Sequence, residues 1–302
     1  MEEIINIETV SQVHKMAGRS EPLHPLISVI KFTEEAARKD FDRLKVRSGL
    51  YFISLKAGHH CPMVYGRNTY DFESGSMIFI APNQVMTFES PKTNASYGTW
   101  ALVFHPDLIR KSPLGENIDQ YNYFSYEANE GLHISEKEKD ILFDLLGKIE
   151  YELNQNLDKH SQELIIATLE LFLKYCDRFY DRQFYTRTNL NKDFVTSFER
   201  LLKDYYRSEK PFKLGLPTVK YCGESLNMSP KYLSDLLKKE TGKSTQEHIH
   251  HFVINKAKNQ LLASSSSISE LAYDLGFEYP QHFAKVFKRK VGMSPSQYRN
   301  AS

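Results

Sequence analysis

The last third of this 302-residue chain contains the same pattern twice, which sharply limits what it can fold into. Residues 232–239 and 282–289 place apolar and basic side chains at matching positions, 50 residues apart, and Gly242 matches Gly292. Upstream, each copy has small or apolar residues at the i, i+3, i+4 and i+7 positions of a helix. These are Val219, Cys222, Gly223 and Leu226 in the first copy, and Ile268, Leu271, Ala272 and Leu275 in the second. Two short helices in succession predict a helix-turn-helix in each copy.

The residues between the paired helices indicate where each turn lies. The first turn is Asn227-Met228, and the second, Gly276-Phe277-Glu278, is one residue longer. Proline at the first position of a helix costs no hydrogen bond and has a helical φ angle. The pairs Ser229-Pro230 and Tyr279-Pro280 therefore predict the start of the second helix in each copy.

The second helix of each copy has an apolar face and a polar face, so the polar face is a candidate surface for DNA. The candidate DNA-binding residues are Lys231, Ser234, Asp235 and Lys238 in the first copy, and Pro280, Gln281, Lys285, Lys288 and Arg289 in the second. Side chains near the start of a recognition helix reach base edges in the major groove, whereas later lysines more often contact phosphates.

A further amphipathic run between the two copies, from Ser244 to Leu262, predicts one long helix that spaces them. Two motifs on one rigid spacer could enter successive major grooves on the same face of DNA, about 34 Å apart. The charge of the chain supports this interpretation. Residues 190–302 contain 18 basic and 11 acidic side chains, whereas residues 1–189 contain 21 and 27. A basic module attached to an acidic one is a common arrangement in proteins that bind nucleic acid.

The C-terminal pattern resembles the DNA-binding domain of the AraC/XylS family of bacterial transcription regulators. The resemblance covers about residues 214–299 and is most specific at Gly276-Phe277, at Val286-Phe287-Lys288 and at Ser294-Pro295. It implies an all-α domain with two helix-turn-helix motifs that binds double-stranded promoter DNA, contact with RNA polymerase, and a homodimer. The chain departs from the family pattern at Val253, where arginine is usual. Asp235 would repel phosphate but could accept a hydrogen bond from a cytosine amino group.

The N-terminal part has short strand patterns separated by turn residues. They lie within residues 50–58, 68–82, 84–91 and 96–104, a spacing that suggests a small barrel or sandwich. Residues 68–89 are similar to the cupin-like effector domain common in the same family, although the histidine frequent after the proline turn is replaced by Val85-Met86-Thr87. Ser135 and Glu138 predict a capping box that opens a helix, and a second helical run covers residues 161–180.

The expected architecture is therefore a two-domain α+β chain. Residues 1–182 would form a cupin-like β-barrel with helices, residues 183–192 a linker, and residues 193–302 the DNA-binding domain. Four aromatic residues on the strands are candidates for an effector pocket, although a barrel core uses such residues as well and the core is the favoured interpretation. They are Tyr51, Phe79, Phe88 and Trp100.

Catalytic and metal chemistry have no strong candidate in this sequence. His59, His60 and Cys61 are adjacent rather than spaced as cupin ligands are, and His248, His250 and His251 fit a helix surface. We therefore expect no catalytic residue, no metal and no cofactor. The absence of an apolar run of ~18 residues or a signal sequence predicts a cytoplasmic protein with no membrane association.

The preferred hypothesis is a sequence-specific transcription regulator whose N-terminal domain senses a small molecule, mediates dimerisation, or both. One alternative is an effector-independent regulator whose N-terminal domain serves only assembly. Another is a cupin-type enzyme fused to a DNA-binding tail.

Overall fold

The structure of the protein is a computed structural model that describes residues 4–31, 44–56, 63–65, 68–70, 75–88, 98–126, 130–156, 158–186, 188–263 and 266–300. The chain divides into two compact units, residues 1–186 and residues 187–302. Each unit has its own hydrophobic core. Among the described residues, no helix is long and apolar enough to cross a membrane.

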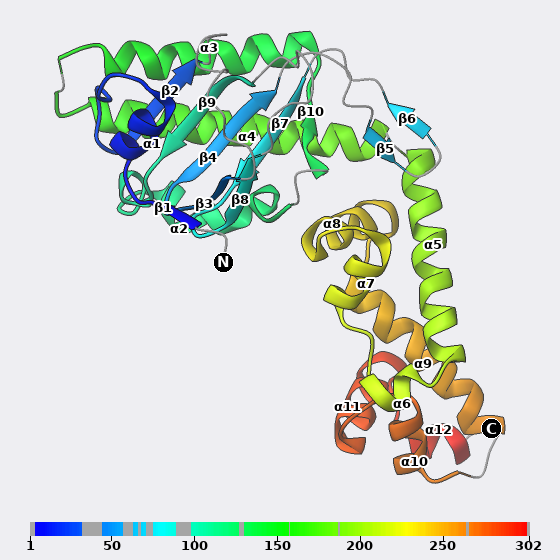
Figure 1. The fold of residues 1–302 in the computed structure, drawn as a ribbon. Coiled ribbons are helices and arrows are strands. Elements are labelled where there is room, and N and C mark those ends of the chain that lie inside the picture. Colours follow the sequence, from blue (N-terminus) through cyan, green and yellow to red (C-terminus); the bar gives the residue numbers. More distant parts are fainter. Residues whose placement is uncertain are drawn as a thin grey trace. The chain divides into compact units, whose positions relative to one another are not determined.

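The N-terminal unit combines strands with helices (Figure 1). Its strands are β1 (Ile4–Ile7), β2 (Ile27–Lys31), β3 (Leu44–Ser48), β4 (Tyr51–Lys56), β5 (Met63–Tyr65), β6 (Asn68–Tyr70), β7 (Ser76–Ile80), β8 (Val85–Phe88), β9 (Gly98–Phe104) and β10 (Leu132–His133). Its helices are α1 (Val10–Ala17), α2 (Pro113–Asn117), α3 (Glu136–Leu153) and α4 (Ser161–Thr186). Three short 3₁₀ helices cover Pro106–Leu108, Ile118–Gln120 and Asn122–Ser125.

The strands form three separate sheets among the described residues. A five-stranded sheet has the order β10-β7-β4-β9-β2, a three-stranded sheet the order β1-β3-β8, and β5 pairs with β6. No described strand pairs the larger two sheets with each other, so the expected small barrel is not closed by hydrogen bonds there. Strands β4, β6, β7, β8 and β9 lie within the predicted segments, in the parts of those segments that the structure describes. The sequence did not predict β1, β2, β3, β5 and β10, nor the parallel pairing of β1 with β3.

Strand β9 is buried on both sides, which explains its nearly continuous apolar sequence. Trp100 packs edge-on against Phe143 of α3 and Phe172 of α4. The alternate residues Ala101 and Val103 belong to a core cluster shared with β1, α1 and β3. The five-stranded sheet is therefore covered by α3 and α4 on one face and by the three-stranded sheet and α1 on the other.

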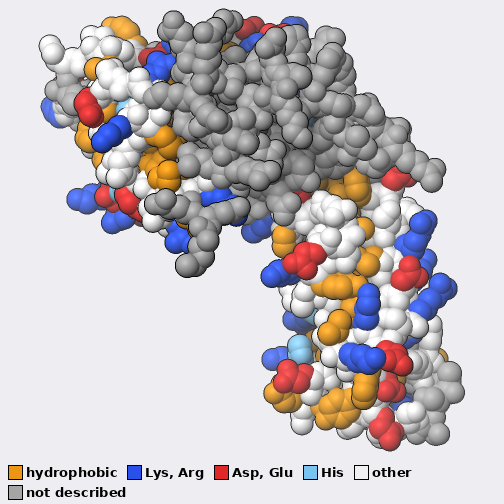
Figure 2. Space-filling view, viewed as in Figure 1, with side chains coloured by type: hydrophobic (Ala, Val, Ile, Leu, Met, Phe, Trp, Pro, Cys, Tyr) orange, Lys and Arg blue, Asp and Glu red, His pale blue; other side chains and the backbone are white. Residues whose placement is uncertain are grey.

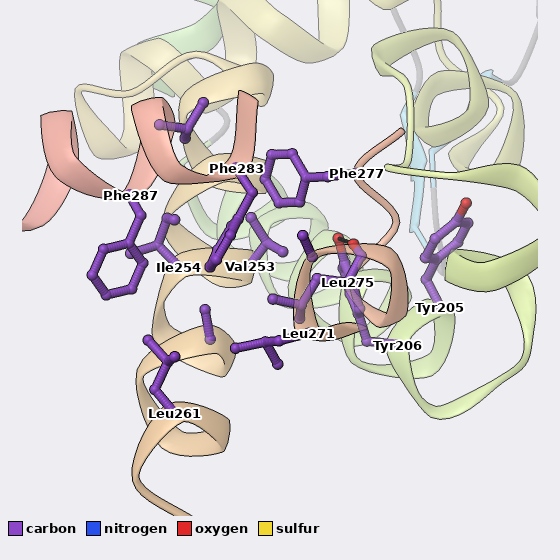
Figure 3. Close-up of a cluster of buried hydrophobic side chains, with 13 residues drawn as sticks. Tyr205, Tyr206, Val253, Ile254, Leu261, Leu271, Leu275, Phe277, Phe283 and Phe287 are labelled. Atoms are coloured by element: carbon purple, nitrogen blue, oxygen red, sulfur yellow. Dashed lines mark hydrogen bonds between the residues drawn. The ribbon is translucent and has the colours of Figure 1, made fainter. Parts of the chain in front are cut away.

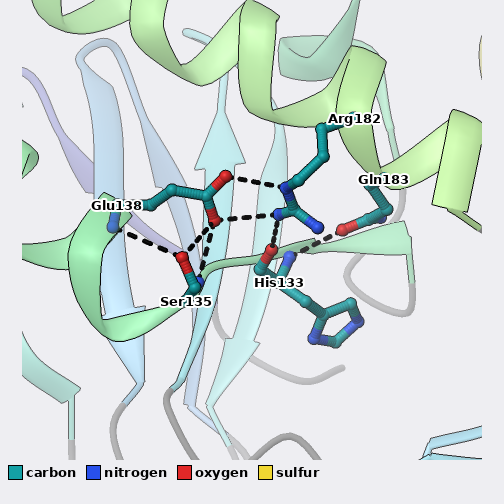
Figure 4. A network of polar contacts seen from close by, with 5 residues as sticks. All are labelled: His133, Ser135, Glu138, Arg182 and Gln183. Carbon is teal, nitrogen blue, oxygen red and sulfur yellow. Dashed lines mark hydrogen bonds and ion pairs between the residues drawn. The ribbon is translucent and has the colours of Figure 1, made fainter.

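Hydrogen bonds and an ion pair join the end of α4 to strand β10 and to the start of α3 (Figure 4). Arg182 donates to both carboxylate oxygens of Glu138, at 2.7 and 3.0 Å, and to the backbone oxygen of His133 at 2.6 Å. The buried Gln183 side chain accepts from the backbone amide of His133 at 2.8 Å. Glu138 also completes the predicted capping box with Ser135. These bonds hold the last turns of α4 on the N-terminal unit.

The predicted linker, residues 183–192, is mainly helical. Helix α4 continues to Thr186, and helix α5 begins at Thr188. In this segment Gln183 and Phe184 are buried, so its first residues belong to the N-terminal unit rather than to an extended linker.

The C-terminal unit is entirely helical in its described part. Its helices are α5 (Thr188–Arg207), α6 (Lys210–Leu214), α7 (Val219–Leu226), α8 (Pro230–Thr241), α9 (Thr245–Ala263), α10 (Ile268–Asp274), α11 (Pro280–Val291) and α12 (Pro295–Asn300). The predicted pairs α7–α8 and α10–α11 and the predicted spacer α9 are confirmed. Figure 3 shows Phe283 and Phe287 of α11 directed toward Val253 and Ile254 of α9, within one buried cluster.

Val253, the departure from the family pattern, lies in that cluster and has no exposed surface. An apolar side chain is therefore the one this core requires. The missing arginine is replaced by packing against the second repeat.

Candidate nucleic-acid interface

The two candidate recognition helices, α8 and α11, begin at the predicted prolines. Ser229 caps α8, since its hydroxyl accepts from the backbone amide of Tyr232 at 3.2 Å. Tyr279 occupies the matching position before α11 and makes no such bond. The preceding turns use left-handed backbone at Asn227 (φ 55°) and Gly276 (φ 89°). Asparagine and glycine tolerate that conformation better than other residues.

The apolar faces of both helices are buried, as predicted. Leu233, Leu236 and Leu237 of α8 have no exposed surface, and neither have Phe283 and Phe287 of α11. Close packing of α7 on α8 depends on a residue without a side chain, because a Cβ at Gly223 would lie 2.6 Å from the carbonyl oxygen of Met228. Burial of one face fixes which side chains each helix presents on the other.

The predicted DNA-binding residues lie on the other face. Those that are exposed are Lys231, Lys238, Gln281, Lys285, Lys288 and Arg289, and those that are half-buried are Ser234, Asp235 and Pro280. Gln281 and Lys285 are one helical turn apart on α11, as Lys231 and Asp235 are on α8, so each pair shares a face. The two repeats thus present equivalent pairs with different hydrogen-bonding character. That they contact DNA stays a prediction.

Basic side chains of both helices lie near the first turns of α9. The pKa of Glu247 is lowered mainly by hydrogen bonds from Ser244, and further by the charges of Lys290 and Lys238. Burial lowers the pKa of His250, and the nearby Arg289 and Lys290 lower it further. The ends of α8 and α11 therefore lie within electrostatic reach of one segment of α9, although Figure 2 shows basic side chains on other parts of this unit as well.

The turn of the second repeat contacts the segment that precedes the first repeat, backbone against backbone. A Cβ added at Gly276 would lie 2.6 Å from the carbonyl carbon of Gly215, which follows α6. Two tyrosines at the end of α5 bond to the backbone on both sides of this contact. The Tyr205 hydroxyl donates to the backbone oxygen of Gly215 at 2.8 Å, and the Tyr206 hydroxyl to that of Leu275 at 3.4 Å. The contact joins the second repeat to α5 and to the segment after α6, while α8 and α11 each pack on α9.

The candidate effector-pocket residues of the N-terminal unit take part in packing. Tyr51 stacks on Phe104, with ring centroids 4.8 Å apart, and Phe79 packs on Tyr123. Trp100 is 1% exposed and Phe79 is 3% exposed. Phe88 ends β8, and its side chain is not among those described. The three described rings thus contribute to the core, which is the alternative role that the sequence left open.

Of the histidines considered as metal ligands, the structure describes only those of α9. The described residues contain no group of three or more His, Cys, Asp or Glu side chains that could hold a metal ion. His59, His60 and Cys61 lie outside the described residues. His248 is more than a surface residue, because its Nε2 is 2.6 Å from the Thr241 hydroxyl and its ring packs edge-on to Phe198. His251 contacts Asn255 on the same helix.

Comparison with known proteins gives matches that include the C-terminal unit. Residues 222–301 match a family described as a helix-turn-helix domain. The chain is 24% identical over 192 residues to YijO, an uncharacterised HTH-type transcriptional regulator of Escherichia coli, covering 64% of each chain. It is 28% identical over 159 residues to the HTH-type transcriptional activator RhaR of Escherichia coli, covering 52% of each chain. The matches thus span less than two thirds of the length of these relatives.

Among solved structures, the C-terminal domain of the two-component response regulator yesN from Fusobacterium nucleatum is 28% identical to this chain. That likeness covers 35% of this chain and 96% of the other, with a TM-score of 0.31.

Proposed function

Residues 222–301 form a helix-turn-helix domain of the AraC type, and from this premise we propose that the protein is a sequence-specific, DNA-binding transcription regulator. The observation that carries the proposal is the pair of equivalent exposed faces on α8 and α11, each backed by a buried apolar face. A single helix-turn-helix occurs in other contexts. Two in a fixed relation suit a ligand that repeats every helical turn, which double-stranded DNA does.

The exposed side chains suggest which bases each helix contacts. Lysine pairs with the acceptors of guanine, and glutamine with the N6 and N7 edge of adenine. Lys231 would therefore favour guanine and Gln281 adenine, while the Asp235 carboxylate would accept from the amino group of cytosine. Lys238, Lys288 and Arg289 lie toward the ends of their helices and would contact phosphates.

Selection of bound fragments by the full-length protein from random double-stranded DNA tests this function. We expect enrichment of two short conserved blocks whose centres are about 10 base pairs apart, because α8 and α11 would enter successive major grooves. A library that shows no enrichment over several rounds at about 150 mM salt would overturn the proposal. The salt concentration is kept fixed, because non-specific binding to DNA weakens steeply as the salt concentration rises.

We also propose that the N-terminal unit assembles two copies of the protein. Leu164 and Leu171 of α4 are 48% and 46% exposed, two helical turns apart on one face, and Tyr151 of α3 is 63% exposed. Phe143, Tyr151 and Leu164 line a groove between these two helices. Apolar surface gathered in this way is typical of an interface, and a second copy supplies the same surface in a symmetric dimer.

Sedimentation of the full-length protein tests this assembly. We expect the wild type to form a dimer at micromolar concentration. Replacement of Leu164 and Leu171 by glutamate should give monomers, because burying the new charges would be costly. The matched control replaces Glu163 and Glu170 of the same helix by glutamine and should leave the dimer intact. A wild type that sediments as a monomer, or a dimer unaffected by both pairs of changes, would contradict the proposal.

Small-molecule sensing and contact with RNA polymerase stay predictions from the resemblance. The packing of Tyr51, Phe79 and Trp100 favours the effector-independent alternative, because rings that fill a core leave no room for a ligand among themselves.

A further inference from the structure

The position just before the recognition helix is used differently in the two repeats. Ser229 is 3% exposed, and its hydroxyl caps α8. Tyr279, at the matching position, makes no capping bond and is 59% exposed. The first repeat therefore uses this position for its own stability. The second places a large ring on the surface instead.

The backbone at Tyr279 is held firmly although its ring is exposed. The Tyr279 carbonyl oxygen accepts from the backbone amides of His282 at 3.0 Å and Phe283 at 3.3 Å, so it is part of the first turn of α11. The neighbouring Phe277 and Phe283 are buried and pack on each other, with centroids 5.2 Å apart. The ring thus projects from an anchored segment, two residues before Gln281.

The charges beside Tyr279 indicate what the ring would contact. Glu278 is the neighbouring residue in the chain, and its carboxylate, by hydrogen bonding and by its charge, raises the pKa of Tyr279. A carboxylate at this point disfavours a phosphate, because both groups are anionic. Base edges carry no such charge. In the major groove the largest apolar feature on a base edge is the 5-methyl group of thymine.

We infer that Tyr279 is a specificity residue, whose ring packs on the 5-methyl group of a thymine beside the base contacted by Gln281. The inference rests on the proposed function, since it requires that α11 enters the major groove. It adds an aromatic contact to an interface whose other proposed members, apart from Pro280, are polar or charged side chains. In the sequence, Tyr279 was noted only as the residue before Pro280, at the position that Ser229 occupies in the first repeat.

Deoxyuridine substitution in the selected DNA tests this contact with the full-length protein. Each thymine of the selected site is replaced in turn by deoxyuridine, which lacks only the methyl group. We expect one replacement to weaken wild-type binding about fourfold, the value of one buried methyl group. Tyr279→Ala should weaken binding to the unmodified site by at least as much and should no longer respond to that replacement. Tyr279→Phe should behave as the wild type.

The control is Phe212→Ala, which removes a ring that is 78% exposed but lies on α6, outside both helix-turn-helix motifs. It should leave affinity and the deoxyuridine profile unchanged. If Tyr279→Ala melts at the wild-type temperature and keeps the wild-type profile, the thymine contact is wrong although the proposed function stands. Weaker binding by Tyr279→Ala with no methyl-sensitive position would also overturn it. Failure of the wild type to select any sequence would instead overturn the proposed function itself.

Discussion

Replacing Gln281 and Lys285 by alanine is expected to weaken binding to the selected DNA by roughly 10- to 100-fold for each change. Both side chains are exposed on the outer face of α11, one turn apart, so their loss removes base contacts without disturbing the buried face. A good base contact is worth about 1–3 kcal/mol. Gel-shift titration at fixed salt measures the dissociation constants, and a thermal melt verifies that the fold is intact.

Lys238→Ala provides the contrast for these two variants. Lys238 is exposed near the end of α8, where we expect a phosphate contact. Its removal should weaken binding to all sequences alike and reduce the slope of log affinity against log salt by about 0.9, the value for one neutralised phosphate. Sequence preference unchanged in Gln281→Ala and Lys285→Ala alike would contradict the assignment of α11 as a recognition helix.

Gly276→Ala is expected to destabilise the C-terminal unit by about 3 kcal/mol. Gly276 has a φ of +89°, which costs an alanine about 1 kcal/mol, and its new Cβ would lie 2.6 Å from the Gly215 carbonyl carbon. The clash is with backbone, so relief requires the two segments to separate. A shift in melting temperature of about 10 °C would follow for a unit of this size.

The matched control is Gly242→Ala. Gly242 also has a positive φ, +74°, but a Cβ there would meet nothing within 4 Å. The Gly242→Ala variant should therefore be destabilised only by the cost of a positive φ at alanine, about 1 kcal/mol. Equal melting temperatures for the two variants would show that the contact between Gly215 and Gly276 is not tight in solution.

The two helix pairs and the spacer helix of the C-terminal unit could be predicted because the features that define them are local, whereas α5, α6 and α12 were not predicted. Pro230 and Pro280 open their helices, and the i, i+3, i+4 pattern identifies the buried faces of α7 and α10. The position of the exposed faces of α8 and α11, which we propose contact bases, followed from the same periodicity. By contrast, the Gly215–Gly276 contact joins residues 61 positions apart, and no local pattern reports an approach between two backbones.

The N-terminal unit was harder to predict for a similar reason. Strands bounded by turn residues were recognisable, as in Tyr51–Lys56 and Ser76–Ile80. Which strands pair is a property of distant segments, so the parallel pairing of Ile4–Ile7 with Leu44–Ser48 left no signal in either. Whether an aromatic residue lines a cavity or fills a core also depends on its neighbours. Trp100 belongs to the core because Phe143 and Phe172, from two distant helices, pack against its ring.

The backbone contact at Gly215 and Gly276 has a consequence for the promoters that such a protein could control. With the turn of the second repeat packed against the segment before α7, and with both repeats packed on α9, one copy would tolerate no insertion between the two short stretches of DNA that we propose it contacts. Target promoters could then differ only in the spacing between the DNA segments bound by two different copies. The segment that connects the two units of each chain, and not the helical domain, would limit that spacing.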